Sequence, residues 1–199
     1  AGQRCTACSR VIVHKDVKEE LEQKLLKEMK HLTIGNGLDE SVKIGPVINK
    51  RAIEKIASYV EVGNGEGAKL LAGGNVLTDG DLANGHYFEP TLFTDVKWDS
   101  RLAKEEIFGP VVSLIEVGSL EEAIEVNNSV IFGLSSSIFS RDVNKVFQAQ
   151  RDLDTGIVYV NAGTTGAEIH LPFGGTKGTG NGHRVSGVAA LYVFTEWKR

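Results

Sequence analysis

Two cysteines near the start of the chain, Cys5 and Cys8, are the residues best suited to covalent chemistry. Their C-x-x-C spacing fits a catalytic nucleophile, a redox dithiol, half of a zinc site, or two packed side chains. Free cysteine is among the most often buried residue types, so the spacing alone favours packing about as strongly as the three reactive interpretations together.

The rest of the chain weakens two of these interpretations. A zinc site needs a second ligand pair, but there is no further cysteine and the five histidines lack zinc-like spacing, so no metal is expected. A thioredoxin-like dithiol follows a strand, which the few residues before Cys5 do not provide. A nucleophile needs a lowered pKa or a nearby base, whereas Gly2 and Gln3 permit a tight turn but supply no base. The residues alone leave Cys5 a candidate nucleophile, with packing as the alternative.

The composition is that of a globular protein. Of the 199 residues, 41% are hydrophobic and 24% are charged, and 23 glycines indicate many turns. A net charge of −4 without a dense Lys/Arg stripe predicts neither a nucleic-acid partner nor an anionic membrane. No apolar run reaches the roughly 18 residues that span a bilayer, and the N-terminus lacks signal-peptide character, so a cytoplasmic location is expected.

Apolar runs and helical periodicities alternate along the chain, which predicts an α/β fold. Strands are expected at residues 9–13, 68–72, 91–96, 111–117, 134–139 and 156–161. Helices are expected after an Asp16–Glu19 capping box, from Asn49, after a Ser119–Glu122 capping box, and from Asp142 with Val143, Val146 and Phe147 inward. Such alternation implies crossover units and a mostly parallel sheet with helices on both faces, in one compact domain.

The first few residues and the part of the chain after residue 161 differ from this alternating pattern. Residues 162–182 form a long glycine-rich stretch, which is typical of a functional loop. Residues 189–194 are apolar and aromatic, which predicts a last strand or an edge that pairs with another chain. At the start, a loop-like sequence appears within five residues, which suggests that the chain was cut from a longer one.

Four separated blocks together resemble the aldehyde dehydrogenase superfamily. They are GQRCTA at 2–7, KEEIFGPV at 104–111, YVN at 159–161, and PFGG at 172–175 followed by Lys177. Turns at 34–36, 45–46 and 132–135 are similar too, so the resemblance covers essentially the whole chain. It implies a catalytic domain over residues 1–188 and a C-terminal segment, 189–199, that leads to an oligomerisation strand.

The resemblance implies NAD(P)-dependent oxidation of an aldehyde to a carboxylate. Cys5 would attack the carbonyl to give a thiohemiacetal, hydride would pass to the nicotinamide, and water would hydrolyse the resulting thioester. Glu106 would hold the nicotinamide ribose hydroxyls, because a carboxylate accepts two hydroxyl donors well, and Phe108 would pack beside that part of NAD or NADP.

Other residues receive softer roles from the same resemblance. Phe173 would border the substrate entrance, and Glu168 and His170 would help to select the aldehyde. Asn161 is expected to be a structural residue that ends its strand, and Cys8 a packed residue. The loop at 164–168 resembles those of semialdehyde-oxidising members.

The chain also departs from the family pattern. The dinucleotide-binding domain, the general-base glutamate and the oxyanion asparagine lie N-terminal to the matched region in the family, so most cofactor contacts would be missing and the isolated chain is not expected to transfer hydride. After His183 and Arg184, Val185 replaces the usual glutamate and removes an expected polar contact near the C-terminus. The intact enzyme is expected to be a homo-oligomer. A non-catalytic assembly or regulatory module and residual thiol esterase chemistry at Cys5 remain open alternatives.

Overall fold

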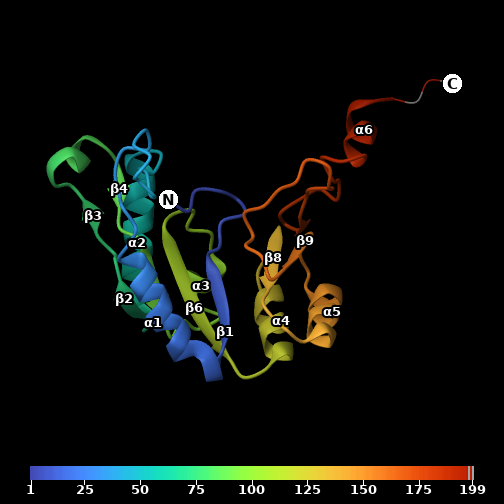
Figure 1. Cartoon of the computed structure of the whole chain (residues 1–199), viewed down its shortest axis with the longest axis horizontal. Coiled ribbons are helices and arrows are strands. Elements are labelled where there is room, and N and C mark those ends of the chain that lie inside the picture. Colours follow the sequence, from blue (N-terminus) through green and yellow to red (C-terminus); the bar gives the residue numbers. More distant parts are fainter. Residues whose placement is uncertain (197, 199) are drawn as a thin grey trace. The chain divides into compact units, whose positions relative to one another are not determined.

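The chain folds into two compact units, Ala1–Ser119 and Leu120–Arg199 (Figure 1). The sequence had predicted one compact domain. The structure is a computed structural model that describes residues 1–196 and Lys198. Within this described part, no helix is both long enough and apolar enough to cross a membrane.

A four-stranded sheet forms the centre of the first unit. Its strand order is β1 (Arg10–His14), β6 (Val111–Val117), β5 (Thr91–Thr94) and β2 (Lys69–Ala72). Both β1 and β5 run parallel to β6, whereas β2 pairs antiparallel at the edge. The four strands predicted in this region and the mostly parallel sheet are confirmed. The short pair β3 (Val76–Leu77) and β4 (Tyr87–Phe88) and the 3-10 helix η2 (Gly80–Asn84) occupy the loop between β2 and β5.

Helices cover both faces of this sheet. Side chains alternate between the faces along each strand, so both faces present apolar side chains that need to be buried. Leu92 and Leu114 lie on one face in a cluster with Val13, against which the apolar side of α1 (Lys18–Met29) packs. The neighbouring Phe93 points to the other face, where it is fully buried close to Gly63 of α2 (Lys50–Gly65).

The two long helices of the first unit begin differently. The helix expected from about Asn49 is confirmed as α2, and Asn49 caps it, since its Oδ1 accepts a hydrogen bond from the main-chain N–H of Ala52 at 2.9 Å. The predicted Asp16–Glu19 capping box of α1 is wrong. Asp16 lies inside the 3-10 helix η1 (Lys15–Val17) and donates its own N–H to His14 Nδ1 at 3.3 Å, whereas a capping residue precedes the helix in an extended conformation.

The second unit contains a parallel strand pair, β8 (Ser135–Ile138) and β9 (Ile157–Val160), and an antiparallel pair, β7 (Phe132–Gly133) and β10 (Thr176–Lys177). Helices α4 (Leu120–Asn128) and α5 (Val143–Asp152) contact each other (Figure 1). Asp142 caps α5 as predicted, with its Oδ1 accepting from the N–H of Asn144 at 2.9 Å. The strands predicted over 134–139 and 156–161 are confirmed.

The predicted inward face of α5 is wrong. Val143 and Phe147 are 60% and 66% exposed, whereas Ala149 is buried and Val146 is half-buried. Phe147 is about 100° around the helix from Val146, and it lies outside the side of α5 that is buried. The buried stripe is therefore narrower than the apolar sequence pattern.

The strand predicted over residues 189–194 is also wrong, because these residues form α6 (Ala189–Phe194). Main-chain bonds from Ala190 to Gly187 and from Leu191 to Val188 begin this helical turn. Six apolar residues fit a short helix as well as a strand, so their hydrophobicity did not discriminate. The approach to the expected oligomerisation strand includes Trp197 and Arg199, which lie outside the described residues.

Candidate active site

Cys5 lies in an exposed turn at the start of the first unit. The main-chain N–H of Ala7 donates to the carbonyl of Arg4 at 2.9 Å and closes the turn around Cys5. Both cysteines are free thiols, and both are exposed as residues. The Cys8 sulfur donates to the carbonyl of Arg10 at 3.6 Å, and burial around that sulfur raises the pKa of the Cys8 thiol, partly opposed by this hydrogen bond. The two sulfurs therefore have different surroundings although they are three residues apart.

Two contacts attach the Cys5 turn to the rest of the unit. Gly2 adopts a φ of +68°, and a Cβ at this position would overlap the main-chain carbonyl of Gly109. Gln3 uses its side-chain Oε1 to accept a hydrogen bond from the main-chain N–H of Ile48 at 2.8 Å. Glycine is required at position 2, since other residues rarely adopt this backbone conformation and no side chain fits against the carbonyl.

The Cys5 turn thereby meets the segment that contains Glu106 and Phe108. Glu106 is exposed, and Lys55 Nζ holds its main-chain carbonyl at 2.6 Å. Phe108 is 38% exposed and has a φ of +58°, a left-handed conformation that costs a non-glycine residue about 1 kcal/mol. The buried neighbours Ile107 and Gly109 hold this strained residue in place, as is common at functional sites.

Helix α2 supports the same segment through side chains that sequence reasoning missed. Tyr59 donates its hydroxyl to Glu105 Oε2 at 2.7 Å, and Arg101 donates to both carboxylate oxygens of Glu105 at 3.0 Å. These two donors, Arg101 first, lower the pKa of Glu105 to about 2. Burial, and then the contact with Glu105, raises the pKa of Tyr59. The only sequence signal was the four-residue spacing between residues 55 and 59 and between residues 101 and 105. Such spacing also occurs on many surface helices.

A further tie comes from the end of α2. Glu66 accepts hydrogen bonds from the main-chain N–H groups of Arg101 and Leu102 at 2.8 and 3.1 Å, at the start of α3 (Arg101–Lys104). Ile56, fully buried on α2, lies so close to Gly109 that a Cβ there would collide with it. The segment from Arg101 to Gly109 is thus held along most of the length of α2.

These positions fit what a nicotinamide ribose requires. Within the described residues, the Glu106 carboxylate accepts no hydrogen bond, so both of its oxygens can accept hydroxyl donors. Phe108 offers a partly exposed aromatic ring two residues away. No group of three His, Cys, Asp or Glu side chains converges in the described part of the chain in a way that would hold a metal ion.

The predicted substrate residues belong to the second unit. Phe173 is half-buried, and its main-chain N–H and carbonyl pair with Val185 at 2.6 and 2.8 Å. Glu168 and His170 are exposed in the loop that precedes Phe173, where the Glu168 carbonyl accepts from the N–H of Leu171 at 3.0 Å. The structure therefore brings these three residues into one loop region, while Cys5, Glu106 and Phe108 lie in the first unit. Val185 contributes its main chain to this pairing despite lacking the carboxylate of the family pattern.

Two residues of the resembling blocks have structural contacts. Asn161 ends β9 with a φ of +53°, and its side chain pairs with the main-chain N–H and carbonyl of Ser140 at 2.9 and 3.0 Å, which confirms the structural role predicted for it. Lys177 donates to the carbonyl of Asn128 at 3.2 Å and lies 3.8 Å from Asp154. Both residues tie loops of the second unit together.

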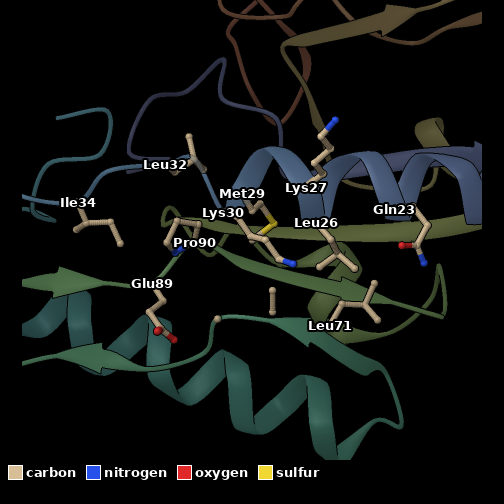
Figure 2. A pocket seen from close by; sticks show the side chains of 12 residues that line it. Gln23, Leu26, Lys27, Met29, Lys30, Leu32, Ile34, Leu71, Glu89 and Pro90 are labelled. Carbon is tan, nitrogen blue, oxygen red and sulfur yellow. The ribbon is translucent and has the colours of Figure 1, made fainter. Parts of the chain in front are cut away.

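A cavity of about 590 Å³ in the first unit lies away from these residues, between α1 and the β2 edge (Figure 2). Leu26 and Met29 of α1 and Leu71 of β2 line it together with Pro90. None of the site residues predicted from the sequence contributes to its lining. The cavity is therefore not the place of the cysteine chemistry.

Comparison with known proteins agrees with the geometry. A sequence profile described as the aldehyde dehydrogenase family matches residues 1–199. Alpha-ketoglutaric semialdehyde dehydrogenase of Bacillus subtilis (strain 168) is 44% identical over 197 residues, which are 99% of this chain and 40% of that protein. The 1-pyrroline-5-carboxylate dehydrogenase of Staphylococcus aureus (strain JH1) is 41% identical over 199 residues, which are 100% of this chain and 38% of that protein.

Solved structures give the same result. Betaine aldehyde dehydrogenase from Staphylococcus aureus, in complex with NAD+, superimposes with a TM-score of 0.93 at 36% identity and covers 98% of this chain and 38% of that chain. A putative aldehyde dehydrogenase from Burkholderia cenocepacia gives a TM-score of 0.94 at 31% identity, with 98% and 40% covered. The chain spans about 40% of the length of the curated relatives that it matches. The chain belongs to the aldehyde dehydrogenase family.

Proposed function

We propose that Cys5 is the nucleophile of an NAD(P)-dependent oxidation of an aldehyde to a carboxylate. The observation that carries this proposal is the exposed Cys5 turn, held by Gly2 against the Glu106–Gly109 segment. The Cys5 sulfur and the candidate ribose-binding carboxylate of Glu106 therefore belong to neighbouring segments of one compact unit. The names of the similar proteins support aldehyde oxidation.

In this chemistry the Cys5 sulfur bonds to the aldehyde carbonyl carbon and forms a thiohemiacetal, while the carbonyl oxygen takes up the displaced electron pair. Hydride would leave the former carbonyl carbon as its C=O bond re-forms, which gives a thioester on Cys5; a nicotinamide held beside Glu106 and Phe108 would supply the acceptor. Water would then attack the thioester carbon, the C–S bond would break, and the sulfur would leave as a thiolate with the electron pair, while the carboxylate is released and the protons of the water pass to solvent. Exposure of Cys5 provides the access that both the aldehyde and the water need.

Glu106 and Phe108 would orient the nicotinamide end of NAD or NADP. The Glu106 carboxylate accepts the ribose hydroxyls, and the Phe108 ring limits where the nicotinamide ring can lie. An NAD+ complex of a similar structure supports a nicotinamide cofactor. The remaining cofactor contacts are expected in the portion of the relatives that this chain does not match.

The substrate class that we favour is an aldehyde that also carries a carboxylate. Two similar proteins are named alpha-ketoglutaric and alpha-ketoglutarate semialdehyde dehydrogenase, and the latter, from Haloferax volcanii, is 41% identical. Phe173 would border the entrance, and the exposed Glu168 and His170 would select among aldehydes. A cytoplasmic location and a homo-oligomeric parent enzyme stay predictions.

Thiol labelling tests the nucleophile directly. The chain is treated with iodoacetamide at neutral pH, and peptide mapping by mass spectrometry gives the rate at each cysteine. Cys5 is expected to react faster than Cys8, because burial raises the pKa of the Cys8 thiol and lowers its thiolate fraction. The variants Cys5→Ala and Cys8→Ala form the matched pair. An inert Cys5 beside a reactive Cys8 would contradict the assignment.

A second activity follows from the same exposed thiol. Acyl transfer to Cys5 requires no hydride acceptor, so the chain is expected to cleave an activated ester such as p-nitrophenyl acetate. Release of p-nitrophenolate should disappear in Cys5→Ala and persist in Cys8→Ala. Turnover that survives Cys5→Ala would exclude this activity.

A further inference from the structure

We propose that Gln3 is a positioning residue for Cys5, and that it acts by fixing the cysteine turn to the segment that immediately precedes α2. This inference rests on the proposed nucleophilic role of Cys5. The side chain of Gln3 reaches a residue 45 positions along the chain, where Oε1 accepts from Ile48 N–H at 2.8 Å.

The point to which Gln3 attaches is itself fixed. Val47 is only 3% exposed, and its N–H donates to the carbonyl of His86 at 2.8 Å. Asn49 caps α2 on the other side. Between them Ile48 has a 77% exposed side chain, so packing does not explain its place and its main-chain N–H makes the contact. Gln3 thus binds the cysteine turn to a rigid part of the unit.

A second contact, made by Gly2, also attaches the residues before Cys5. Gly2 lies against the Gly109 carbonyl, and Ile56 of α2 lies against Gly109. The residues just before Cys5 are therefore held at two points, by Ile48 just ahead of α2 through Gln3, and by Gly109, which packs on α2, through Gly2. Two attachment points restrict rotation of the turn, whereas one would leave a pivot. Loss of Gln3 leaves the Gly2 contact and should free the sulfur to move.

The chemistry of the contact predicts which substitutions are tolerated. Within the described residues Gln3 uses its amide oxygen as an acceptor, and its amide nitrogen donates no hydrogen bond. Glutamate has the same length and keeps the acceptor, and its negative charge is favourable near the N-terminus of α2. Methionine has a similar length but only a weak acceptor. The contrast between Gln3→Glu and Gln3→Met isolates the hydrogen bond from side-chain size.

The test is pre-steady-state acylation of the full 199-residue chain by p-nitrophenyl acetate. The Cys5 thiolate sulfur bonds to the acetyl carbon, the ester C–O bond breaks, and p-nitrophenolate leaves with the electron pair. Water later hydrolyses the thioester to acetate and returns the thiol. The rate of p-nitrophenolate release is measured from pH 6 to 10 for Gln3→Met, Gln3→Glu and the control Gln23→Met, which changes an exposed glutamine on α1.

In Gln3→Met we expect the plateau of the pH profile to fall about tenfold with an unchanged midpoint, because the geometry of attack is disturbed and the thiol is not. Gln3→Glu should recover most of this loss, and Gln23→Met should match the parent. Alkylation by iodoacetamide, which makes little demand on orientation, should be unaffected by Gln3→Met, and the thermal unfolding midpoint shows whether the variant is folded.

The outcomes separate this inference from the proposed function. If Cys5→Ala acylates as fast as the parent, the nucleophile assignment fails and the inference fails with it. If Cys5 is required but Gln3→Met keeps the parental plateau, or Gln3→Glu is as slow as Gln3→Met, only the role of Gln3 is overturned. A shifted midpoint in Gln3→Met would also overturn it, since Gln3 would then act on the thiol pKa.

Discussion

Replacement of Gly63 by alanine tests whether the close approach of α2 to the sheet supports the site. Gly63 is buried on α2, where a Cβ would lie 2.9 Å from the Leu102 side chain and 3.0 Å from the ring of Phe93. Phe93 is fully buried and Leu102 is 3% exposed, so neither can move aside into solvent. The added methyl group would therefore push α2 away from the strand that it covers.

Two opposing effects decide the sign of the change. Alanine in place of glycine inside a helix stabilises the folded state by about 0.5–1 kcal/mol through lower backbone entropy in the unfolded chain. Overpacking of a well-filled core costs about 1–3 kcal/mol. Because a contact of 2.9 Å with buried Leu102 and contacts of 3.0 Å with the ring of buried Phe93 leave little room for relaxation, the second effect dominates. We expect Gly63→Ala to lower the free energy of unfolding by about 1 kcal/mol.

Gly65→Ala is the matched control, since it lies two residues along the same helix and its Cβ would meet no atom within 4 Å. Its free energy of unfolding should be equal to that of the parent or slightly higher. Urea unfolding at constant m-value measures both variants, and acylation of Cys5 reports on the site. If Gly63→Ala proves as stable as Gly65→Ala, the packing of α2 against Phe93 is looser than the structure indicates.

Three further changes test individual contacts. Lys55→Met should speed amide hydrogen exchange over residues 105–109, because the Glu106 carbonyl loses its donor. Lys55→Arg should restore the protection. Lys50→Met changes an exposed lysine of the same helix and should have no effect. The pKa of Glu105, lowered from 4.5 to about 2, means that its contacts with Arg101 and Tyr59 favour folding above about pH 4.5 and lose this effect as pH falls through 2; an NMR titration of the carboxyl group with a midpoint near 4.5 would contradict this. Asp142→Ala should cost about 1 kcal/mol of unfolding free energy by removing the α5 cap, whereas Arg141→Ala should not.

Elements with strong local signals could be predicted from the sequence. Strand β6 has the expected bounds, because its apolar run is limited by Pro110 and Gly118 and is buried in the sheet. The helices expected from Asn49 and Asp142 start at these residues, because each side chain accepts a hydrogen bond from a main-chain N–H two or three residues ahead. At α1 the predicted capping box was wrong. His14 caps a short 3-10 helix that contains Asp16, and α1 begins only after this turn.

The candidate site also contains residues that the sequence predicted and residues that it did not. Cys5, Glu106 and Phe108 were predicted as site residues through blocks that resemble a family, because a thiol or carboxylate alone does not reveal its role. Gln3 and Lys55 were missed as supporting residues, since each bonds to a main-chain group 45 or 51 residues away. Ordinary polar residues carry no local mark of such partners. The exposed apolar face of α5 was misread for a related reason, because hydrophobic periodicity shows which residues are apolar and not what covers them.

The inequivalence of the two cysteines gives a last prediction. Cys5 and Cys8 are both free and lie three residues apart, so sequence spacing alone allowed a paired role. Burial raises the pKa of the Cys8 thiol above its ordinary value of 9.0, and its hydrogen bond to Arg10 opposes this only in part. In the Cys5→Ala variant, alkylation of Cys8 should therefore rise with pH to a midpoint above 9.0, and ester cleavage at neutral pH should not be rescued. A midpoint at or below 9.0 would mean that the Cys8 sulfur is solvated, and the structural distinction between the two thiols would no longer support the proposal that Cys5 alone is the nucleophile.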